Sequence, residues 1–546
     1  MKKTIQIGLF VIASLFLMNS LVAGQISGPR YGGTFVIAIN AEPGGLNPVL
    51  WLGAEPQLST SPIFNKLIEL DTKGRPRGDL IQSWEVSQDK KKYTFRLVRN
   101  VKWHDGRPLT SADVFWTFMG TRQGYLVHPR YSTAIEPLVE SYEVPDDYTF
   151  VIQLKKPFTP FLMLLANDLY GPCILPKHIF EGTDIKRNKA NWDPIGTGAF
   201  KFKEWIKGDH IELVKNEDYF KKGKPYLNKL VIRFMPDENA RLLALEKGEV
   251  DYLYFYVVPY SAVPNLKKNP DIVITDEGAK LIGQIQMWIF NLLKPPFNNI
   301  KVRQAVAYAI NRQRMNEAAY FGLARPAYSV NGKDIPFWNE DVVEKYETGN
   351  QARDLEKASK LLDEAGYPRG KDGIRFKTTL LYMSGRPYEG KVGEVAREEL
   401  RKVGIELDMQ PVDRPTFIEK IFSRWDFEVS SQQFSAGPHP FAGIPRYIKW
   451  SQHKAGLYPS NAMGYNNPRL EELFDKSVNA KTEVEEAKIW AECQKIISED
   501  LPVLPIVEMP YTGALRAEWK DVFPGVDGYL KIGETVWWTK GHLPKR

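Results

Sequence analysis

A histidine and an aspartate stand side by side in the segment Trp103-His104-Asp105-Gly106. An imidazole beside a carboxylate is a pair that general acid–base catalysis uses, so this segment is the first candidate for chemistry. Neighbouring residues on an extended chain point to opposite faces, however, and Asp-Gly favours a turn. Thr110 and Asp113 then form a capping-box pattern. We therefore interpret the segment as a structural turn before a capped helix.

The segment Gly385 to Lys391 has the glycine and lysine spacing of a phosphate-binding loop. Such a loop needs a Ser or Thr after the lysine to hold Mg²⁺, and here Val392 stands at that position. Pro387 also removes one of the backbone N–H groups that would surround a phosphate. We interpret the segment as a surface loop before a helix.

Other catalytic patterns are missing from the sequence. No His-Glu-x-x-His motif, no cysteine pair with zinc spacing and no Gly-x-Ser-x-Gly element occurs in the chain. Cys173 and Cys493 are far apart, and we expect two buried free thiols, although an oxidising compartment would permit a disulfide. A secreted hydrolase is the alternative, but no nucleophile, base and orienting group can be named for it. The sequence predicts a protein that is not an enzyme, with no catalytic residue, cofactor or metal.

The first residues have the layout of a secretory signal peptide. Lys2 and Lys3 precede an apolar run from Ile7 to Met18, and the small residues Ala23 and Gly24 follow. The run is short for a membrane span, which leaves an uncleaved anchor as the alternative. No cysteine near Ala23 offers the acylation site of a lipoprotein. We expect residues 1–24 to be a signal peptide and the protein to be periplasmic or extracellular.

Composition indicates a soluble chain of two or three domains. Its 546 residues are 43% hydrophobic and 25% charged, with a formal net charge of +7. Lysines and arginines are interspersed with acids, so no basic stripe marks a nucleic-acid surface. From about residue 211 onward, predicted strands alternate with predicted helices, including strands at 284–290 and 503–507. This alternation predicts a mixed α/β sheet.

Several motifs together resemble the solute-binding protein family 5 receptors of ABC importers. They occur in family order from about Gly32 to beyond Pro505, and each alone is weak. The matching segments are 80–84 with 93–97, 103–114, 194–200, 302–311, 358–367, 464–468 and 498–505.

The resemblance implies a two-lobed periplasmic-binding-protein type II (cluster C) fold. That fold has mixed sheets and a subdomain inserted in the first lobe, and two chain segments cross between the lobes near 279–288 and 506–512. It places lobe I at 25–56, 189–278 and 507–546, the inserted subdomain at 57–188, and lobe II at 279–506.

The resemblance also implies a ligand held between the two lobes and delivered to the permease subunits of an ABC importer, by a receptor that acts as a monomer. Loops at strand ends face such a cleft, and they supply most of the residues that we predict as ligand contacts, with a structural or core role as the alternative for each. The predicted contacts are Glu42, Asn47 and Trp51 from lobe I, Trp288 near the first crossing, and Gln432, Gln433 and Phe434 from lobe II.

The sequence leaves two alternatives for the identity of the ligand. Peptide-binding members of the family carry an Asp before the Pro-x-Pro element, where it pairs with the α-ammonium of the peptide. Here Ala436 and Gly437 precede Pro438. A peptide is expected from the commonest use of the family, and an oligosaccharide or another non-peptide solute is the alternative.

Overall fold

The computed structural model describes residues 28–51, 53–124, 126, 129–168, 170–255, 257–523, 525 and 532–539. The predicted signal peptide, 1–24, lies outside the described residues. None of the helices within the described ranges combines the length and hydrophobicity that crossing a bilayer requires.

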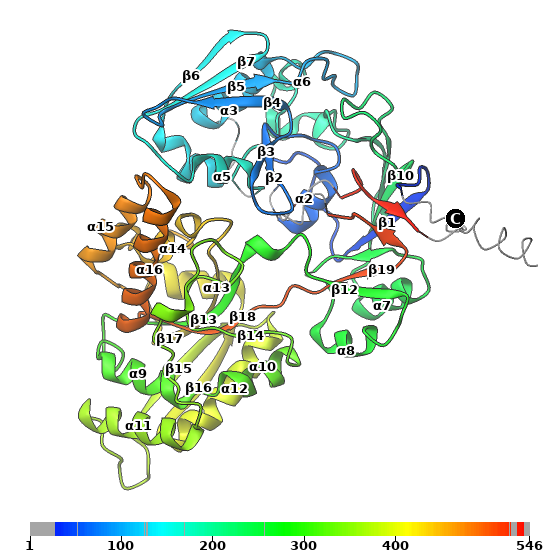
Figure 1. Ribbon diagram of the computed structural model, residues 1–546. Coiled ribbons are helices and arrows are strands. Elements are labelled where there is room, and N and C mark those ends of the chain that lie inside the picture. Colours follow the sequence, from blue (N-terminus) through cyan, green and yellow to red (C-terminus); the bar gives the residue numbers. More distant parts are fainter. Residues whose placement is uncertain are drawn as a thin grey trace, which may run out of the picture.

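Lobe I is built on a seven-stranded mixed sheet (Figure 1). Strand β1 is parallel to both of its neighbours, and the other pairs are antiparallel. Nearly every residue of β1 is buried, as expected for a strand that is covered on both faces. In spatial order the strands are β12 (Ile272–Thr275), β19 (Gly513–Arg516), β11 (Tyr252–Leu253), β1 (Thr34–Ile39), β10 (Lys229–Phe234), β9 (His210–Lys215) and β8 (Phe200–Ile206).

Lobe II is built on a six-stranded mixed sheet. The central strand β13 covers 284–290, as the sequence predicted, and β18 extends the predicted 503–507 by one residue. The predicted mixed α/β fold is therefore confirmed. In spatial order the strands are β14 (Arg325–Pro326), β18 (Val503–Glu508), β13 (Gln284–Phe290), β17 (Val429–Ser435), β15 (Phe376–Met383) and β16 (Ile405–Val412).

A four-stranded antiparallel sheet forms a third body, which we call the inserted subdomain together with helices α3 to α5. It lies in the chain between β1 and the rest of lobe I (Figure 1). Its strands, in spatial order, are β4 (Ile81–Val86), β5 (Lys92–Leu97), β7 (Thr149–Leu154) and β6 (Val139–Asp146). Two small sheets complete the strands: β2 (Ile68–Leu70) with β3 (Pro76–Gly78), and β20 (Trp519–Lys520) with β21 (Trp537–Trp538).

The helices pack around these sheets. Those that precede β13 are α2 (Ala54–Thr60), α3 (Ser111–Gln123), α4 (Pro129–Ala134), α5 (Phe161–Ala166), α6 (Lys177–Phe180), α7 (Glu238–Glu246) and α8 (Val263–Leu266). Those of lobe II are α9 (Ile300–Ala309), α10 (Arg312–Tyr320), α11 (Gln351–Glu364), α12 (Pro387–Lys402), α13 (Arg414–Ile418), α14 (Ile444–Ile448), α15 (Pro468–Ser477) and α16 (Glu483–Asp500).

Local sequence signals account for several helix ends. The predicted capping box of Thr110 and Asp113 begins α3, and Gly366, with φ +86°, follows α11 in the left-handed conformation. The predicted surface loop over 385–391 is wrong from its third residue onward, because α12 already begins at Pro387. Proline suits the first turn of a helix, where its missing N–H would have no partner.

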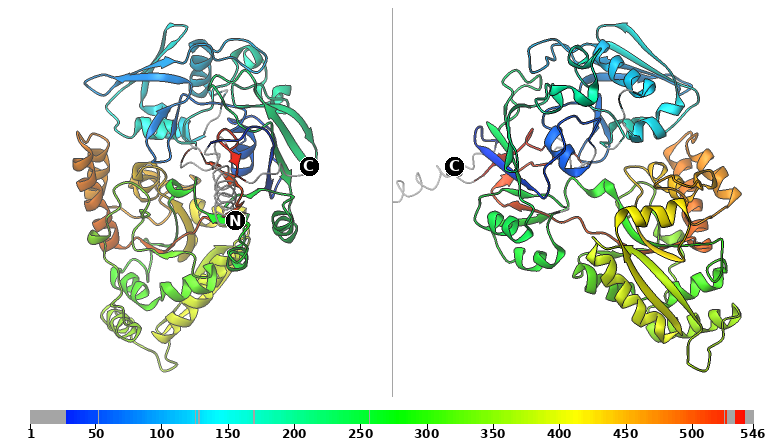
Figure 2. Two further views of the ribbon diagram at one scale, coloured as in Figure 1. Left: turned by 45° about the vertical axis from the view of Figure 1, so that its right-hand side comes forward. Right: turned by 180° about the vertical axis from the view of Figure 1, so that it is seen from behind.

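The hydrophobic cores show how the bodies fit together. Lobe I has its own core, and a second core lies between the lobe II sheet and helices α9 to α12. A third core is shared, because side chains of the inserted subdomain and of the other face of the lobe II sheet form one contiguous cluster. Figure 2 shows the inserted subdomain beside the C-terminal helices of lobe II. The lobes are therefore in contact in this conformation.

Candidate functional site

The inserted subdomain touches lobe II through specific groups as well as through the shared core. The hydroxyl of Tyr170 donates to the main-chain oxygen of Ala442 at 2.8 Å, and the Thr159 amide donates to the Val478 oxygen at 3.0 Å. These contacts join the two segments that flank α5 to the short helix η8 (Pro440–Ala442) and to the end of α15. They form one boundary of the region between the lobes.

A second contact joins lobe I itself to lobe II through tyrosine rings. Tyr260 lies in the short helix η4 (Tyr260–Ala262) of lobe I, and its ring centroid is 5.1 Å from that of Tyr320 and 6.0 Å from that of Tyr388. Its hydroxyl also donates to the Pro510 oxygen at 3.3 Å, in the segment that links β18 to β19. Tyr260 therefore contacts lobe II and a crossing segment at once.

Two segments cross between the lobes, from β12 to β13 and from β18 to β19. The first contains the short helix η5 (Lys280–Ile282) and Gly283 in the left-handed conformation, with φ +55°. The Ser435 hydroxyl, at the end of β17, donates to the Ile282 oxygen. Tyr511 in the second crossing donates to Gln284 Oε1 at 3.5 Å, so the two crossings are linked to each other.

A chain of polar side chains leads from the crossings into lobe II. Gln284 donates to Gln433 Oε1 at 3.1 Å, and Gln433 donates to the Tyr388 hydroxyl at 2.6 Å and to Glu389 Oε1 at 3.1 Å. Arg386 pairs with the same carboxylate at 2.9 Å. Burial raises the pKa of Glu389 even though Arg386 and Gln433 favour its charged form. Charged and amide groups are thus held at the first turn of α12, beside the crossings.

The three residues predicted from lobe I have different environments. Glu42 accepts from Trp205 Nε1 at 2.7 Å and pairs with Lys207 at 3.6 Å, so it is tied to the β8–β9 hairpin. Asn47 is buried and shapes its own loop by accepting from the Val49 amide at 3.1 Å.

Trp51, the third of these residues, is half-buried. Its ring lies against the backbone of Gly44 and Gly45, where an added Cβ at Gly45 would come within 2.4 Å of the indole. Its centroid is 5.9 Å from that of Trp192, which is 39% exposed. Of the three predicted lobe I contacts, Trp51 presents an aromatic surface that its neighbours do not fully cover.

The predicted residues of lobe II lie mostly inside the protein. Trp288 is 1% exposed and belongs to the core beneath α9 to α12, and Gln432 is buried with its amide donated to the Ser430 hydroxyl at 3.0 Å. Phe434 is buried on the opposite face of the sheet and stacks on Tyr447. Gln433 is half-buried and belongs to the polar chain at the crossings. Of these residues, the structure brings Gln433 to the boundary between the lobes.

Four tyrosines that no sequence motif indicated also make these contacts: Tyr170, Tyr260, Tyr388 and Tyr511. Each of these tyrosines lies in a loop, a crossing or a helix end, and each makes a contact between bodies that are distant in the chain. Tyr511 falls within the predicted second crossing and could have been named from that position. The others carry no local signal, because a tyrosine that closes a cleft has the same sequence context as one that packs in a core.

The histidine–aspartate candidate has a structural role, as predicted. His104 Nε2 lies 3.1 Å from the Gly198 oxygen, and its Nδ1 accepts from the Gly196 amide at 3.2 Å. Burial lowers the pKa of His104 to about 4. Asp105 pairs with His178 at 2.8 Å instead of with His104. His104 therefore connects two turns in its neutral form.

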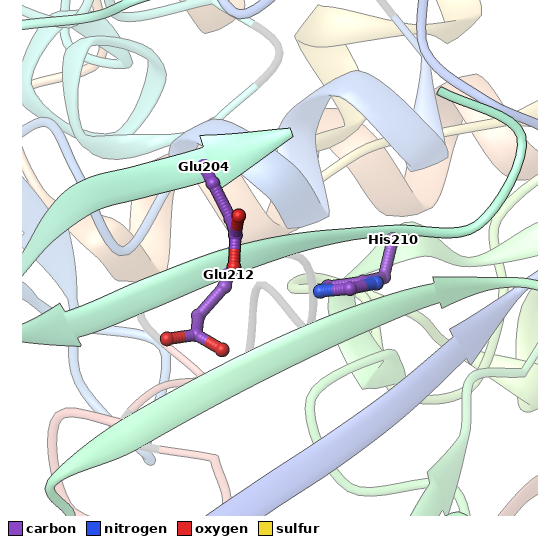
Figure 3. Close-up of side chains that lie close together, drawn as sticks. All are labelled: Glu204, His210 and Glu212. Atoms are coloured by element: carbon purple, nitrogen blue, oxygen red, sulfur yellow. The ribbon is translucent and has the colours of Figure 1, made fainter. Parts of the chain in front are cut away.

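One cluster of possible metal ligands occurs among the described residues. Glu204, His210 and Glu212 on β8 and β9 have ligand atoms within 4.8 Å of one another (Figure 3). Glu212 is already paired with Lys229 at 2.8 Å, and His210 with Asp209 at 2.8 Å. Strand β8 is also the edge strand farthest from the crossings in the lobe I sheet. The cluster is thus part of the sheet surface and separate from the region between the lobes.

Comparison with known proteins places this architecture in a family. Residues 75–452 match the family described as bacterial extracellular solute-binding proteins, family 5. The chain is 29% identical over 508 residues to a putative ABC transporter peptide-binding protein of Brucella ovis, covering 88% of this chain and 90% of that protein.

Solved structures agree with this placement. The oligopeptide-binding protein AppA of Bacillus subtilis in complex with a nonapeptide has a TM-score of 0.73 and 26% identity, over 94% of this chain and 100% of that one. The periplasmic binding protein DppA of Helicobacter pylori in complex with the peptide STSA has a TM-score of 0.75 and 26% identity, over 94% and 99%. The chain therefore belongs to the bacterial extracellular solute-binding proteins of family 5.

Proposed function

We propose that this protein binds a peptide between its two lobes and delivers it to the permease subunits of an ABC importer. The contact between Tyr170 and Ala442 carries the proposal, because it shows that the loop after β17, which resembles the ligand loop of the family, is reached by the inserted subdomain. A ligand between the lobes would then be enclosed. It would shift the population toward the closed state only if it contacts both lobes in that state.

The peptide is favoured over the oligosaccharide alternative by the relatives named above, whose descriptions are those of peptide-binding proteins. An extended peptide offers main-chain donors and acceptors that a receptor binds with little dependence on sequence. Trp51 and Gln433 are the predicted contacts that we retain for this role. Asn47, Gln432, Phe434 and Trp288 would support the site from inside the lobes, and Glu42 would hold the lobe I loop to its hairpin.

This chain departs from the family pattern at the position that would bind the N-terminus of a peptide. Ala436 and Gly437 stand where an acid would pair with an α-ammonium, and Gly437 has φ +72°, which favours glycine. We propose that binding does not require a free peptide N-terminus. Acetylated and unmodified forms of one peptide are then expected to bind with similar affinity.

The same proposal covers three further points. The chain divides into lobes at the predicted boundaries, it is exported with removal of residues 1–24, and it acts as a monomer that binds no nucleic acid and catalyses no reaction. The proposal is supported by the family, whose members are solute-binding receptors. Mass spectrometry of the exported protein measures the cleavage site. Incubation of the purified protein with a bound peptide should return the peptide intact.

A thermal-shift screen tests the choice of ligand. Short peptides, their acetylated and amidated forms, and oligosaccharides are each added to the purified protein. A ligand at 100 times its dissociation constant stabilises the folded state by about 2.7 kcal/mol, which is a clear shift in melting temperature. If oligosaccharides raise the melting temperature and no peptide does, the peptide proposal is wrong.

A further inference from the structure

A cavity of about 490 Å³ lies where the two lobes meet, on the side of the edge strands β12 and β14. Both crossing segments and both lobes contribute to its wall. Lys267 and Ile274 line it from lobe I, Arg325 and Lys333 from lobe II, and Lys280 and Thr512 from the two crossings. Its volume is within the range of small-molecule sites, about 300 to 1,000 Å³.

This cavity is distinct from the proposed peptide cleft. None of the seven predicted ligand contacts lines it. The loop after β17 and the first turn of α12 belong to the other half of the lobe II sheet, because β17, β15 and β16 lie on the far side of β13 from β14. Gln284 is the residue that the cavity shares with the polar chain to Gln433.

Some of the charged side chains around the cavity form ion pairs, and others do not. Arg325 is paired with both Asp334 and Glu508, so its single positive charge offsets one of their two negative charges. Asp276 adds a third acid to the wall. Lys267, Lys280 and Lys333 are exposed, and none of their ammonium groups makes an ion pair with a residue that the structure describes. The four basic and three acidic side chains of the wall leave a formal net charge of +1, and the ammonium groups that make no ion pair with a described residue include Lys267 of lobe I and Lys333 of lobe II.

A hydroxyl in the wall of the cavity lacks a hydrogen-bond partner. Thr512 is 4% exposed, and its Oγ1 makes no hydrogen bond to any of the described residues. A buried polar group without a partner destabilises a folded protein, and a bound ligand that accepts a hydrogen bond from it would remove that cost. The apolar side chains of Ile274, Leu323 and Met509 in the same wall suit a carbon skeleton.

We propose that this cavity binds a small organic anion of the di- or tricarboxylate class, with the lysines around it attracting the carboxylates and Thr512 donating a hydrogen bond to one of them. The apolar part of the wall distinguishes such a ligand from inorganic phosphate. Citrate, succinate and phosphate are suitable probes, because they share negative charge and differ in their carbon skeleton.

Binding in this cavity is coupled to the lobe movement. Lys267 and Lys333 belong to different lobes, so rotation about the crossings changes their separation and with it the affinity for an anion. The cavity is present in the conformation in which the lobes touch, so an anion bound there stabilises that conformation. This coupling rests on the proposed function, since it predicts that the anion tightens peptide binding and that the peptide tightens anion binding by the same factor.

Isothermal titration calorimetry of the purified protein with citrate, at constant ionic strength, tests the site itself. One citrate is expected to bind, with succinate weaker and phosphate weakest. The double variant Lys280→Gln/Lys333→Gln should weaken citrate binding about tenfold, because each partly exposed charge pair contributes a factor of up to about five. The control Lys268→Gln removes an exposed lysine beside α8 that does not line the cavity, and it should leave citrate binding unchanged.

The variant Thr512→Val tests whether the Thr512 hydroxyl binds the anion or only stabilises the fold. The variant keeps the shape of the side chain and removes a hydroxyl without a partner, so the melting temperature of the unliganded protein should stay the same or rise while citrate binding weakens. No citrate binding, binding that the lysine variants do not change, or phosphate binding equal to citrate would each overturn the proposal. Peptide titrations with and without citrate then test the coupling. If citrate binds and no peptide binds, only the proposed peptide function is rejected.

Discussion

The hydroxyl of Tyr170 donates a 2.8 Å hydrogen bond to the main-chain oxygen of Ala442, 272 residues further along the chain. Tyr170 belongs to the loop behind α5, and Ala442 ends the short helix η8 (Pro440–Ala442) after β17. Both residues are buried. Since one lies with the inserted subdomain and the other in lobe II, the bond joins these two bodies in this conformation.

Removing this bond should weaken ligand binding by destabilising the closed state. A neutral buried hydrogen bond contributes about 1 kcal/mol net, so Tyr170→Phe is expected to raise the dissociation constant of a bound peptide about fivefold. Calorimetric titration measures the change. Tyr148→Phe, in the turn between β6 and β7 of the same subdomain, is the matched control. An unchanged peptide affinity in Tyr170→Phe would show that closure does not depend on this bond.

The exposed part of the Trp51 ring is expected to contact the ligand. Trp51→Ala should lower peptide affinity at least about tenfold, because a buried aromatic anchor often contributes 2 kcal/mol or more to binding. The free energy of unfolding of the unliganded protein should change by less than about 1 kcal/mol, since the ring is half-buried and rests on its own loop. Titration and urea denaturation give the two values. A large loss of stability with unchanged affinity would instead assign Trp51 to the core.

Trp288 should show the opposite pattern. It is 1% exposed inside the core of lobe II, so Trp288→Ala is expected to cost about 3 to 5 kcal/mol of stability. The fraction of the variant that still folds should bind peptide with an affinity close to that of the parent protein. Denaturation curves and titrations at 10 °C distinguish the two effects. A large loss of affinity in a variant of normal stability would restore Trp288 as a direct ligand contact.

The ion pair between Lys66 and Asp168 is buried, with side chains 3% and 1% exposed and an N–O distance of 2.5 Å. Lys66→Met leaves the carboxylate of Asp168 without this partner, and breaking a buried pair in this way costs about 3 to 5 kcal/mol. The double variant Lys66→Met/Asp168→Leu should recover much of that loss, because no charge then stays buried. Urea denaturation of both variants checks this, and equal stability of the single and double variants would contradict it.

Stability should fall below neutral pH in part because of His104. Burial lowers its folded-state pKa to about 4 from an ordinary value of 6.5, so the unfolded chain takes up a proton that the folded chain does not. The free energy of unfolding therefore decreases as the pH is lowered from about 7 to 4, by on the order of 3 kcal/mol from this group. His104→Gln can keep one donor and one acceptor in place, and its stability should depend less on pH over this range. Parallel curves for the two proteins would exclude His104 as a source of the dependence.

Local patterns in the sequence were sufficient for many elements of the fold. The buried strand at 284–290 follows from a short run of mostly apolar residues, and the start of α3 follows from the side chains of Thr110 and Asp113, which contact nearby backbone. The beginning of α12 was predicted five residues too late, because the glycine and proline before Val392 indicated a loop. Pro387 in fact occupies the first turn of the helix, where proline is tolerated, and the buried Glu389 of that turn pairs with Arg386.

The sequence by itself determined the class of this protein, because its motifs occur in family order and each reflects a local turn, cap or strand. Tertiary structure alone decided which side chains meet between the lobes. Trp288 and Phe434 lie on adjacent strands near the predicted ligand loop, yet both point into cores, because successive side chains on a strand face opposite sides and each face of the lobe II sheet is covered. Tyr170, Tyr260 and Tyr511 make contacts over hundreds of residues of chain, and such contacts depend on how separately folded bodies pack, which no local pattern records.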